Sequence, residues 1–116
     1  MTARDDSARL AALVARGEAD GSAAVAERAH GDELAADVGG ELALRWRLAV
    51  LRGLMADPPD GDAVRELYGE LVDRYRDDAE SLAIVRPIGD EIRKLEAAGE
   101  LPSTLVARSE RKAKKP

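Results

Sequence analysis

Apolar residues recur at helical spacing along most of the chain, and the clearest case follows Asp62. In that segment they stand at positions i, i+3, i+4, i+7, i+8 and i+11, namely Val64, Leu67, Tyr68, Leu71, Val72 and Tyr75. The opposite face is charged, and Glu70 and Arg74 have the i, i+4 spacing that stabilises a helix. This pattern predicts an amphipathic helix over residues 62–76. The loop before it, residues 57–62, contains two prolines that cannot continue a preceding helix.

The segment from Glu41 to Ala56 is apolar on almost every side of a helix. One side carries Leu42, Trp46, Val50 and Leu54, and the other carries Leu44, Leu48, Leu51 and Met55. Such a helix is typical of the centre of a bundle, where neighbours cover it on most sides. Arg47 falls within the apolar arc, so its guanidinium either extends to solvent or forms a buried ion pair with a carboxylate of another element.

The first 40 residues predict shorter and more weakly anchored helices. Asp5, Asp6 and Ser7 can cap a first helix that ends near Arg16 or Ala19, with Gly17 as its stop. An alanine-rich segment then runs from Ser22 to His30 with Val25 as its one large apolar residue, and helical spacing resumes from Glu33 to Val38. We expect Gly31 and Asp32 to interrupt it, which makes one broken helix or two short ones.

The last helical segment covers about residues 78–98 and contains Pro87. Ile84, Ile88, Ile92 and Leu95 keep helical phase across this proline. Two helical alternatives fit: a single kinked helix, or two helices with Pro87 in the first turn of the second. A short strand over Leu82–Val85 is a third alternative, but it has no obvious pairing partner.

These patterns together predict an all-α protein, a small helical bundle of four to six helices with a disordered basic C-terminal tail. We expect one helical domain over residues 1–100 and an extended arm and tail over residues 101–116. Of the 52 apolar residues 22 are Ala and none is Phe, so the core is light and suited to close helix packing. The absence of Cys excludes disulfides and thiolate chemistry.

Localisation follows from what the sequence lacks. The longest apolar run has six residues, Leu10–Ala15, whereas a membrane span needs about 20. We therefore expect a cytoplasmic protein that does not enter a membrane. The abundance of Ala, Arg, Asp and Gly favours a bacterial or phage origin.

Charge is distributed unevenly along the chain. Residues 1–107 carry 22 acidic and 13 basic side chains, a net charge of −9, whereas residues 108–116 carry a net charge of +4. The basic side chains of this tail are Arg108, Arg111, Lys112, Lys114 and Lys115. An acidic body with a basic tail limits any contact with nucleic acid to the tail, because the body repels phosphates.

The candidate catalytic and metal-binding motifs are weak. Glu27 and His30 have the Glu-x-x-His spacing of di-iron bundles, but His30 is the only histidine. Asp57, Asp60 and Asp62 do not continue into a calcium-binding loop pattern, and Glu66, Glu70 and Asp73 lie on the polar face of a predicted helix. We therefore expect no enzyme activity, no metal and no cofactor.

Two functions fit these observations. The first is a small helical protein–protein interaction module (an adaptor, an inhibitor or a phage or toxin–antitoxin accessory) that self-associates as a homodimer. Its candidate interaction residues are Trp46, Val50, Leu54, Tyr68 and Tyr75. The alternative is an oligomeric regulatory or packaging protein that contacts the phosphates of nucleic acid through its basic tail.

The alternative predicts a binding difference that depends on the tail. A mobility-shift assay at low and moderate salt compares the full chain with a chain that ends at Val106. The full chain is expected to bind and to release nucleic acid as salt rises, because counterion release drives phosphate contacts. Equal binding by both proteins, or by neither, would contradict a role for the tail.

Overall fold

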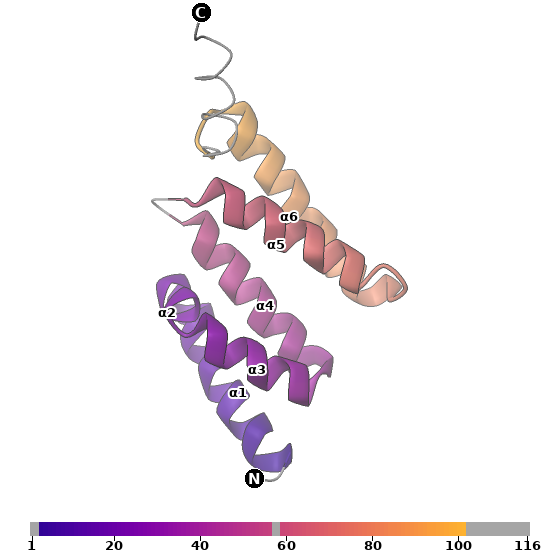
Figure 1. Ribbon diagram of the computed structural model, residues 1–116. Coiled ribbons are helices and arrows are strands. Elements are labelled where there is room, and N and C mark those ends of the chain that lie inside the picture. Colours follow the sequence, from indigo (N-terminus) through magenta and orange to yellow (C-terminus); the bar gives the residue numbers. More distant parts are fainter. Residues whose placement is uncertain (1–2, 57–58, 102–116) are drawn as a thin grey trace, which may run out of the picture. The chain divides into compact units, whose positions relative to one another are not determined.

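The computed structural model describes residues 3–56 and 59–101, and within these ranges the chain forms six helices and no strand (Figure 1). This confirms the all-α prediction. The helices are α1 (Ala3–Ala19), α2 (Gly21–Ala26), α3 (Arg28–Val38), α4 (Gly40–Met55), α5 (Gly61–Arg74) and α6 (Ala79–Ala97).

The chain divides into two compact units, residues 1–56 and residues 57–116. The first unit contains α1 to α4 and the second contains α5 and α6. The prediction of a single domain over residues 1–100 stays a prediction. The predicted basic tail lies outside the described residues.

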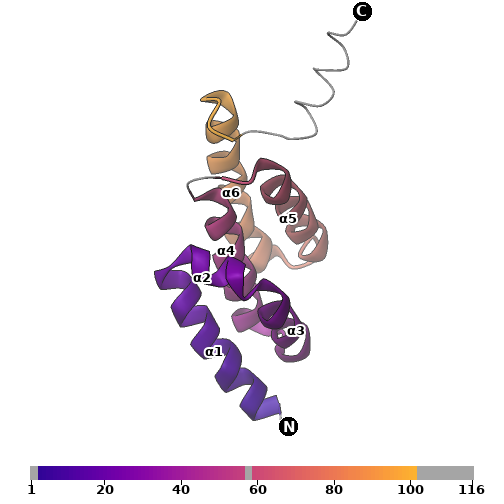
Figure 2. The same ribbon diagram turned by 60° about the vertical axis from the view of Figure 1, so that its left-hand side comes forward.

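In the first unit, α1, α2 and α3 all pack against α4 (Figure 2). Trp46 is 0% exposed and is the largest fully buried side chain of the described residues. Its indole N–H donates a hydrogen bond of 3.0 Å to the Asp32 carboxylate of α3. Leu10 and Val14 of α1 and Leu34 of α3 are also buried. As the apolar pattern predicted, α4 is the central helix of this unit.

Small residues bring these helices close together. A Cβ added at Gly17 would lie 2.9 Å from the Cβ of Ala24 and 3.3 Å from that of Ala49. A Cβ at Gly53 would overlap the backbone of Gly21. The approach of α1 and α2 to α4 therefore requires glycine or alanine at the points of contact.

Two glycine predictions from the sequence were wrong for this reason. Gly17 does not end the first helix but lies buried within α1, which ends at Ala19, the later of its two predicted ends. Gly31 does not interrupt the second segment, because it lies buried within α3, where a Cβ would overlap the indole ring of Trp46. Both glycines serve packing between helices and leave the helices intact.

The break in the second segment falls instead at Glu27, between α2 and α3. The side chain of Asp20 caps α2 by accepting a hydrogen bond of 3.0 Å from the backbone N–H of Ser22. The junction between α3 and α4 is Gly39, whose φ of 66° and ψ of −164° lie in a region that only glycine adopts readily. The start of α1 at Ala3 also places Asp5 and Asp6 in its first turn rather than before it.

The second unit is a pair of helices that pack on each other. Asp60 caps α5 by accepting a hydrogen bond from the backbone N–H of Ala63, and Asp78 caps α6 in the same way through Ser81. The buried apolar side chains are Val64, Leu67 and Leu71 of α5 and Leu82, Val85, Ile88 and Ile92 of α6. They match the helical pattern of the sequence.

Helix α6 passes through Pro87 as one helix, which decides for the first alternative, and it includes Leu82–Val85, so the strand alternative was wrong. It ends at Ala97, with Ala98 as its C-cap, and the next residue is Gly99, whose φ is 73°. The Gly99 N–H donates to the Glu96 carbonyl at 3.1 Å, and the Glu100 N–H donates to the Leu95 carbonyl at 2.9 Å. This pair of bonds is the Schellman motif, which satisfies the last carbonyls of a helix.

Arg65 joins the beginning of α5 to the end of α6. Its Nε donates to the Glu96 carboxylate at 3.0 Å, and its Nη2 donates to the Leu101 carbonyl at 2.9 Å. Leu101 is buried. The guanidinium therefore ties the residue Leu101, which follows α6, to the beginning of α5.

The packing of Trp46 on Gly31 predicts opposite effects for two glycine substitutions. Gly31→Ala should lower the free energy of unfolding by about 1–3 kcal/mol, because the added methyl overlaps the indole. Gly69→Ala should raise it by about 0.5–1 kcal/mol, since nothing lies within 4 Å of that position and alanine favours the helix. Urea unfolding followed by circular dichroism measures both. A Gly31→Ala protein as stable as the original would contradict the close contact.

Candidate functional site

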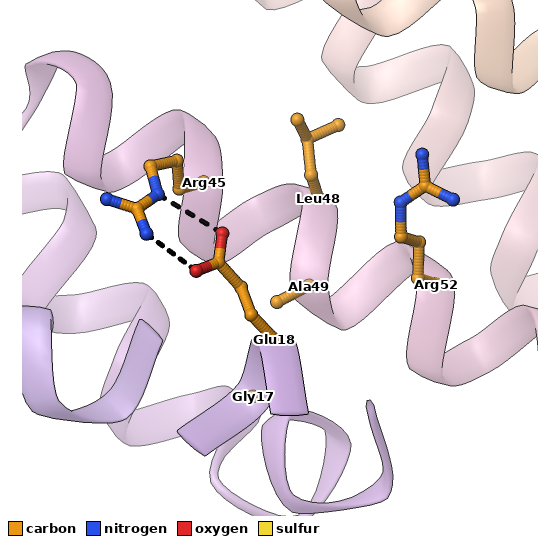
Figure 3. Close-up of a pocket in the computed structure, with 6 residues that line it drawn as sticks. All are labelled: Gly17, Glu18, Arg45, Leu48, Ala49 and Arg52. Atoms are coloured by element: carbon orange, nitrogen blue, oxygen red, sulfur yellow. Dashed lines mark hydrogen bonds and ion pairs between the residues drawn. The ribbon is translucent and has the colours of Figure 1, made fainter. Parts of the chain in front are cut away.

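A pocket of about 300 Å³ opens between α1 and α4 of the first unit. Its lining residues come from the end of α1 and one side of α4: Gly17, Glu18, Arg45, Leu48, Ala49 and Arg52 (Figure 3). Arg45 and Arg52 are seven residues apart, so they occupy nearly the same side of α4 about 10 Å apart along its axis. We refer to this site as the α1–α4 pocket.

One wall of the pocket is an ion pair between Glu18 and Arg45. The Arg45 Nη2 lies 2.6 Å from Glu18 Oε1 and the Arg45 Nε lies 3.1 Å from Glu18 Oε2, so the contact is bidentate. These hydrogen bonds lower the pKa of Glu18 from its ordinary value, and partial burial opposes the shift without cancelling it. The same contact raises the pKa of Arg45. Both side chains are therefore held in their charged forms.

The floor of the pocket is apolar. Leu48 and Ala49 stand between the two arginines (Figure 3). Gly17 has no side chain, so it does not cover this apolar surface. Arg52 borders the pocket at the side away from Glu18 (Figure 3). A guanidinium has five N–H donors, so Arg52, which has an interaction within the chain, can hold a further acceptor.

This arrangement is suited to binding an anionic group that carries a short apolar portion. The lining has two positive charges and one negative charge, over an apolar floor. In the described part of the chain, no group of three or more His, Cys, Asp or Glu residues could hold a metal ion. Across the same residues, no charged or polar residue is buried. The resolved pKa shifts belong to helix caps and surface ion pairs, at Glu18, Asp20, Arg45, Asp78 and Arg93.

Three of the predicted interaction residues are buried on α4. Trp46 and Val50 are almost completely inaccessible, and Leu54 is 8% exposed. Trp46 packs on Gly31 and bonds Asp32, so it belongs to the core of the first unit. An interaction role for these three residues stays a prediction.

The remaining predicted residues are half-buried. Tyr68 lies against Gly89, where an added Cβ would overlap its phenol group. Tyr75 is the C-cap of α5. Arg47 is half-buried and has an interaction within the chain, and its two alternatives, solvent exposure and a buried ion pair, both stay predictions. None of these residues lines the α1–α4 pocket.

Most residues of the weak motifs occupy exposed positions, Asp62 is half-buried, and Asp57 lies outside the described residues. Glu27 and His30 are exposed at the α2–α3 junction and in the first turn of α3. Asp60 caps α5, Glu66 is exposed, Glu70 pairs with Arg74, and Asp73 pairs with Arg76. The tail residues Arg108, Arg111, Lys112, Lys114 and Lys115 lie outside the described residues.

Comparison with known proteins gives no relative: no family model, curated protein or solved structure matches the chain. None of the helices in residues 3–56 and 59–101 is long and apolar enough to cross a membrane. The α1–α4 pocket was not predicted from the sequence, because Glu18 and Arg45 are 27 residues apart. The nearest available signal was the spacing of Arg45, Leu48 and Arg52 on one side of a helix.

The lowered pKa of Glu18 predicts a pH dependence of stability. The ion pair stabilises the fold above the ordinary glutamate pKa, and its contribution is lost as pH falls through the lower pKa of the folded protein. Glu18→Gln should therefore be less stable than the original at about pH 7, and the difference should shrink at about pH 3. Urea midpoints at both pH values measure this. Glu33→Gln, which removes an exposed carboxylate elsewhere, serves as the control, and an equal pH response in both variants would contradict the assignment.

Proposed function

We propose that the protein is a small, non-enzymatic helical interaction module that binds a protein partner through the face of the first unit around the α1–α4 pocket. The partner that we propose first is a second copy of the chain, in a homodimer. Closed two-fold dimers are the commonest oligomers of soluble proteins, and in them the same surface is used twice.

The observation that carries this proposal is the composition of the pocket. Leu48 and Ala49 form an apolar floor, and charged groups from two helices border it. Protein interfaces commonly have an apolar centre with a polar rim, and arginine is enriched in them. The volume of about 300 Å³ is at the lower limit for small-molecule sites. A side chain that protrudes from a partner protein needs only a shallow pocket, whereas a small-molecule ligand must be largely enclosed. The pocket therefore suits the protruding side chain better.

The electrostatics of the described residues also favour binding over catalysis. A catalytic acid or base commonly has a pKa shifted by burial or by a like charge in a cleft. The resolved shifts arise chiefly from hydrogen bonds at helix caps and surface ion pairs. In these groups the charged form is favoured, which suits recognition of a complementary charge.

The alternative function, contact with nucleic acid, is supported by the tail alone. Its net charge of +4 contrasts with the acidic body. This hypothesis depends on residues 108–116, and the mobility-shift comparison described above tests it.

Self-association through the pocket predicts a specific loss on mutation. Light scattering over a range of protein concentrations should show a dimer for the original chain and a monomer for Leu48→Gln, because the substitution places an amide in the apolar floor. Ile84→Gln is the matched control. Ile84 is 52% exposed on α6 and lies outside the pocket, so this variant should remain dimeric.

Two results would contradict the proposal. A monomeric original chain at high concentration would exclude the homodimer. Loss of the dimer in Ile84→Gln, with the dimer retained in Leu48→Gln, would place the interface on α6 instead. Circular dichroism of each variant shows that the helices are intact.

A further inference from the structure

We propose that the second unit carries a separate binding site, a hollow beside the first turns of α6 that receives one carboxylate of a peptide segment from another protein. The hollow has a volume of about 240 Å³ and is lined by Arg76, Ala79, Leu82, Ala83 and Arg86. We refer to it as the α6 hollow. The proposal is independent of the homodimer, because none of these residues lines the α1–α4 pocket.

The α6 hollow arises from the spacing of short side chains along one helix. Ala79, Leu82 and Ala83 stand at i, i+3 and i+4, which places them on one side of α6. Leu82 is buried and both alanines are exposed, so their methyl groups form a shallow apolar floor. Arg86 follows about one turn later on the same side, and Arg76 comes from the turn that precedes α6. Two guanidinium groups therefore border an apolar floor.

Arg86 supplies the positive charge that this hollow offers to a ligand. Its side chain is exposed and makes no hydrogen bond or ion pair with another residue of the described ranges. The carboxylate one turn further along α6, Asp90, bonds Arg93 instead. Because Arg86 has no such partner, all five of its N–H donors are available, and their planar arrangement matches the two oxygens of a carboxylate.

Arg76 contributes less positive charge, because two carboxylates lie near it. Its Nη1 is 3.5 Å from Asp73 Oδ1 and its Nε is 4.0 Å from Asp77 Oδ2. The Arg76 side chain is 71% exposed, and ion pairs at such positions contribute little, so a ligand can exchange with them. The two aspartates nevertheless favour a carboxylate over a phosphate monoester, which carries a charge of about −1.5 to −2 and meets more repulsion.

Size and backbone chemistry favour a peptide segment over a free small molecule. The volume of about 240 Å³ lies below the range of about 300–1,000 Å³ that is common for small-molecule sites. In a regular helix the N–H of residue 87 would donate to the Ala83 carbonyl, but Pro87 has no N–H. A peptide brings backbone N–H groups that can donate to this carbonyl, together with the carboxylate for Arg86.

The charge of the surrounding chain disfavours nucleic acid at this site. Residues 57–107 contain thirteen acidic and six basic side chains, a net charge of −7. Such a charge repels a polyanion along its whole length. A single carboxylate meets this repulsion once and is offset by its contact with Arg86.

Nuclear magnetic resonance of the isotope-labelled, full-length chain tests the site. The probe is acetyl-Ala-Glu-Ala-amide, whose blocked ends leave the glutamate carboxylate as its one charge, and acetyl-Ala-Gln-Ala-amide is the neutral control. The glutamate peptide should cause saturable shifts at the backbone amides of Ala79, Leu82, Ala83 and Arg86. The glutamine peptide should bind about fivefold more weakly or less, and added salt should reduce the difference. Inorganic phosphate is the third probe and should bind more weakly than the glutamate peptide.

Three variants assign the contact to named residues. Arg86→Gln should weaken binding of the glutamate peptide about fivefold or more, because it removes the charge that holds the carboxylate. Ala83→Leu should also weaken it, because leucine fills the floor while it suits the helix nearly as well as alanine. Arg9→Gln is the matched control, since Arg9 is exposed on α1 and does not line the α6 hollow. This variant has the same change of charge and should bind like the original chain.

Three results would overturn the proposal: equal binding of the two peptides, undiminished binding by Arg86→Gln, or an equal loss in Arg86→Gln and Arg9→Gln. Tighter binding of phosphate than of the glutamate peptide would overturn the choice of a carboxylate.

The same measurements keep this site separate from the homodimer. Ile84 is about 100° round α6 from Ala83 and does not line the α6 hollow. Ile84→Gln and Leu48→Gln should therefore both bind the glutamate peptide like the original chain, whatever their oligomeric state. Loss of peptide binding in Leu48→Gln, with its helices intact by circular dichroism, would contradict the independence of the two sites.

Discussion

The first unit depends on the close approach of three helices to α4. A Cβ at Gly17, Gly21 or Gly53 would press on or overlap a neighbouring helix. A Cβ at Gly31 would overlap the ring of Trp46. These contacts compensate for the scarcity of large apolar side chains in the first 40 residues. Dispersion and burial in this unit come from backbone and alanine surfaces held near each other, together with leucine and valine side chains and one buried indole.

The same close approach builds the candidate site. Because Gly17 lets the end of α1 lie near Ala49, the next residue, Glu18, reaches Arg45 on α4. A larger residue at position 17 would push α1 away and separate the two charges. The pocket is the space that remains beside this contact, and its charge pattern follows from which residues of α4 face the end of α1.

Residues along a helix were easier to predict than residues between helices. The central helix, the amphipathic helix after Asp60 and the helix through Pro87 follow from apolar spacing, and the structure begins and ends them within a few residues of the expected positions. Gly17 and Gly31 were misinterpreted as a stop and a break. In an isolated sequence a glycine that weakens a helix and a glycine that permits contact are identical, and only the neighbour, Ala49 or Trp46, distinguishes them.

The sequence by itself determined the helical class, the identity of the central helix and the contrast between an acidic body and a basic end. These properties depend on residues near one another in the chain, where periodicity and capping act. The tertiary structure alone decided that Glu18 meets Arg45, that Asp32 holds the indole of Trp46, and that Arg65 bonds Glu96 and Leu101. Each of these contacts joins residues 14 to 36 positions apart, and their pairing depends on how closely the helices pack.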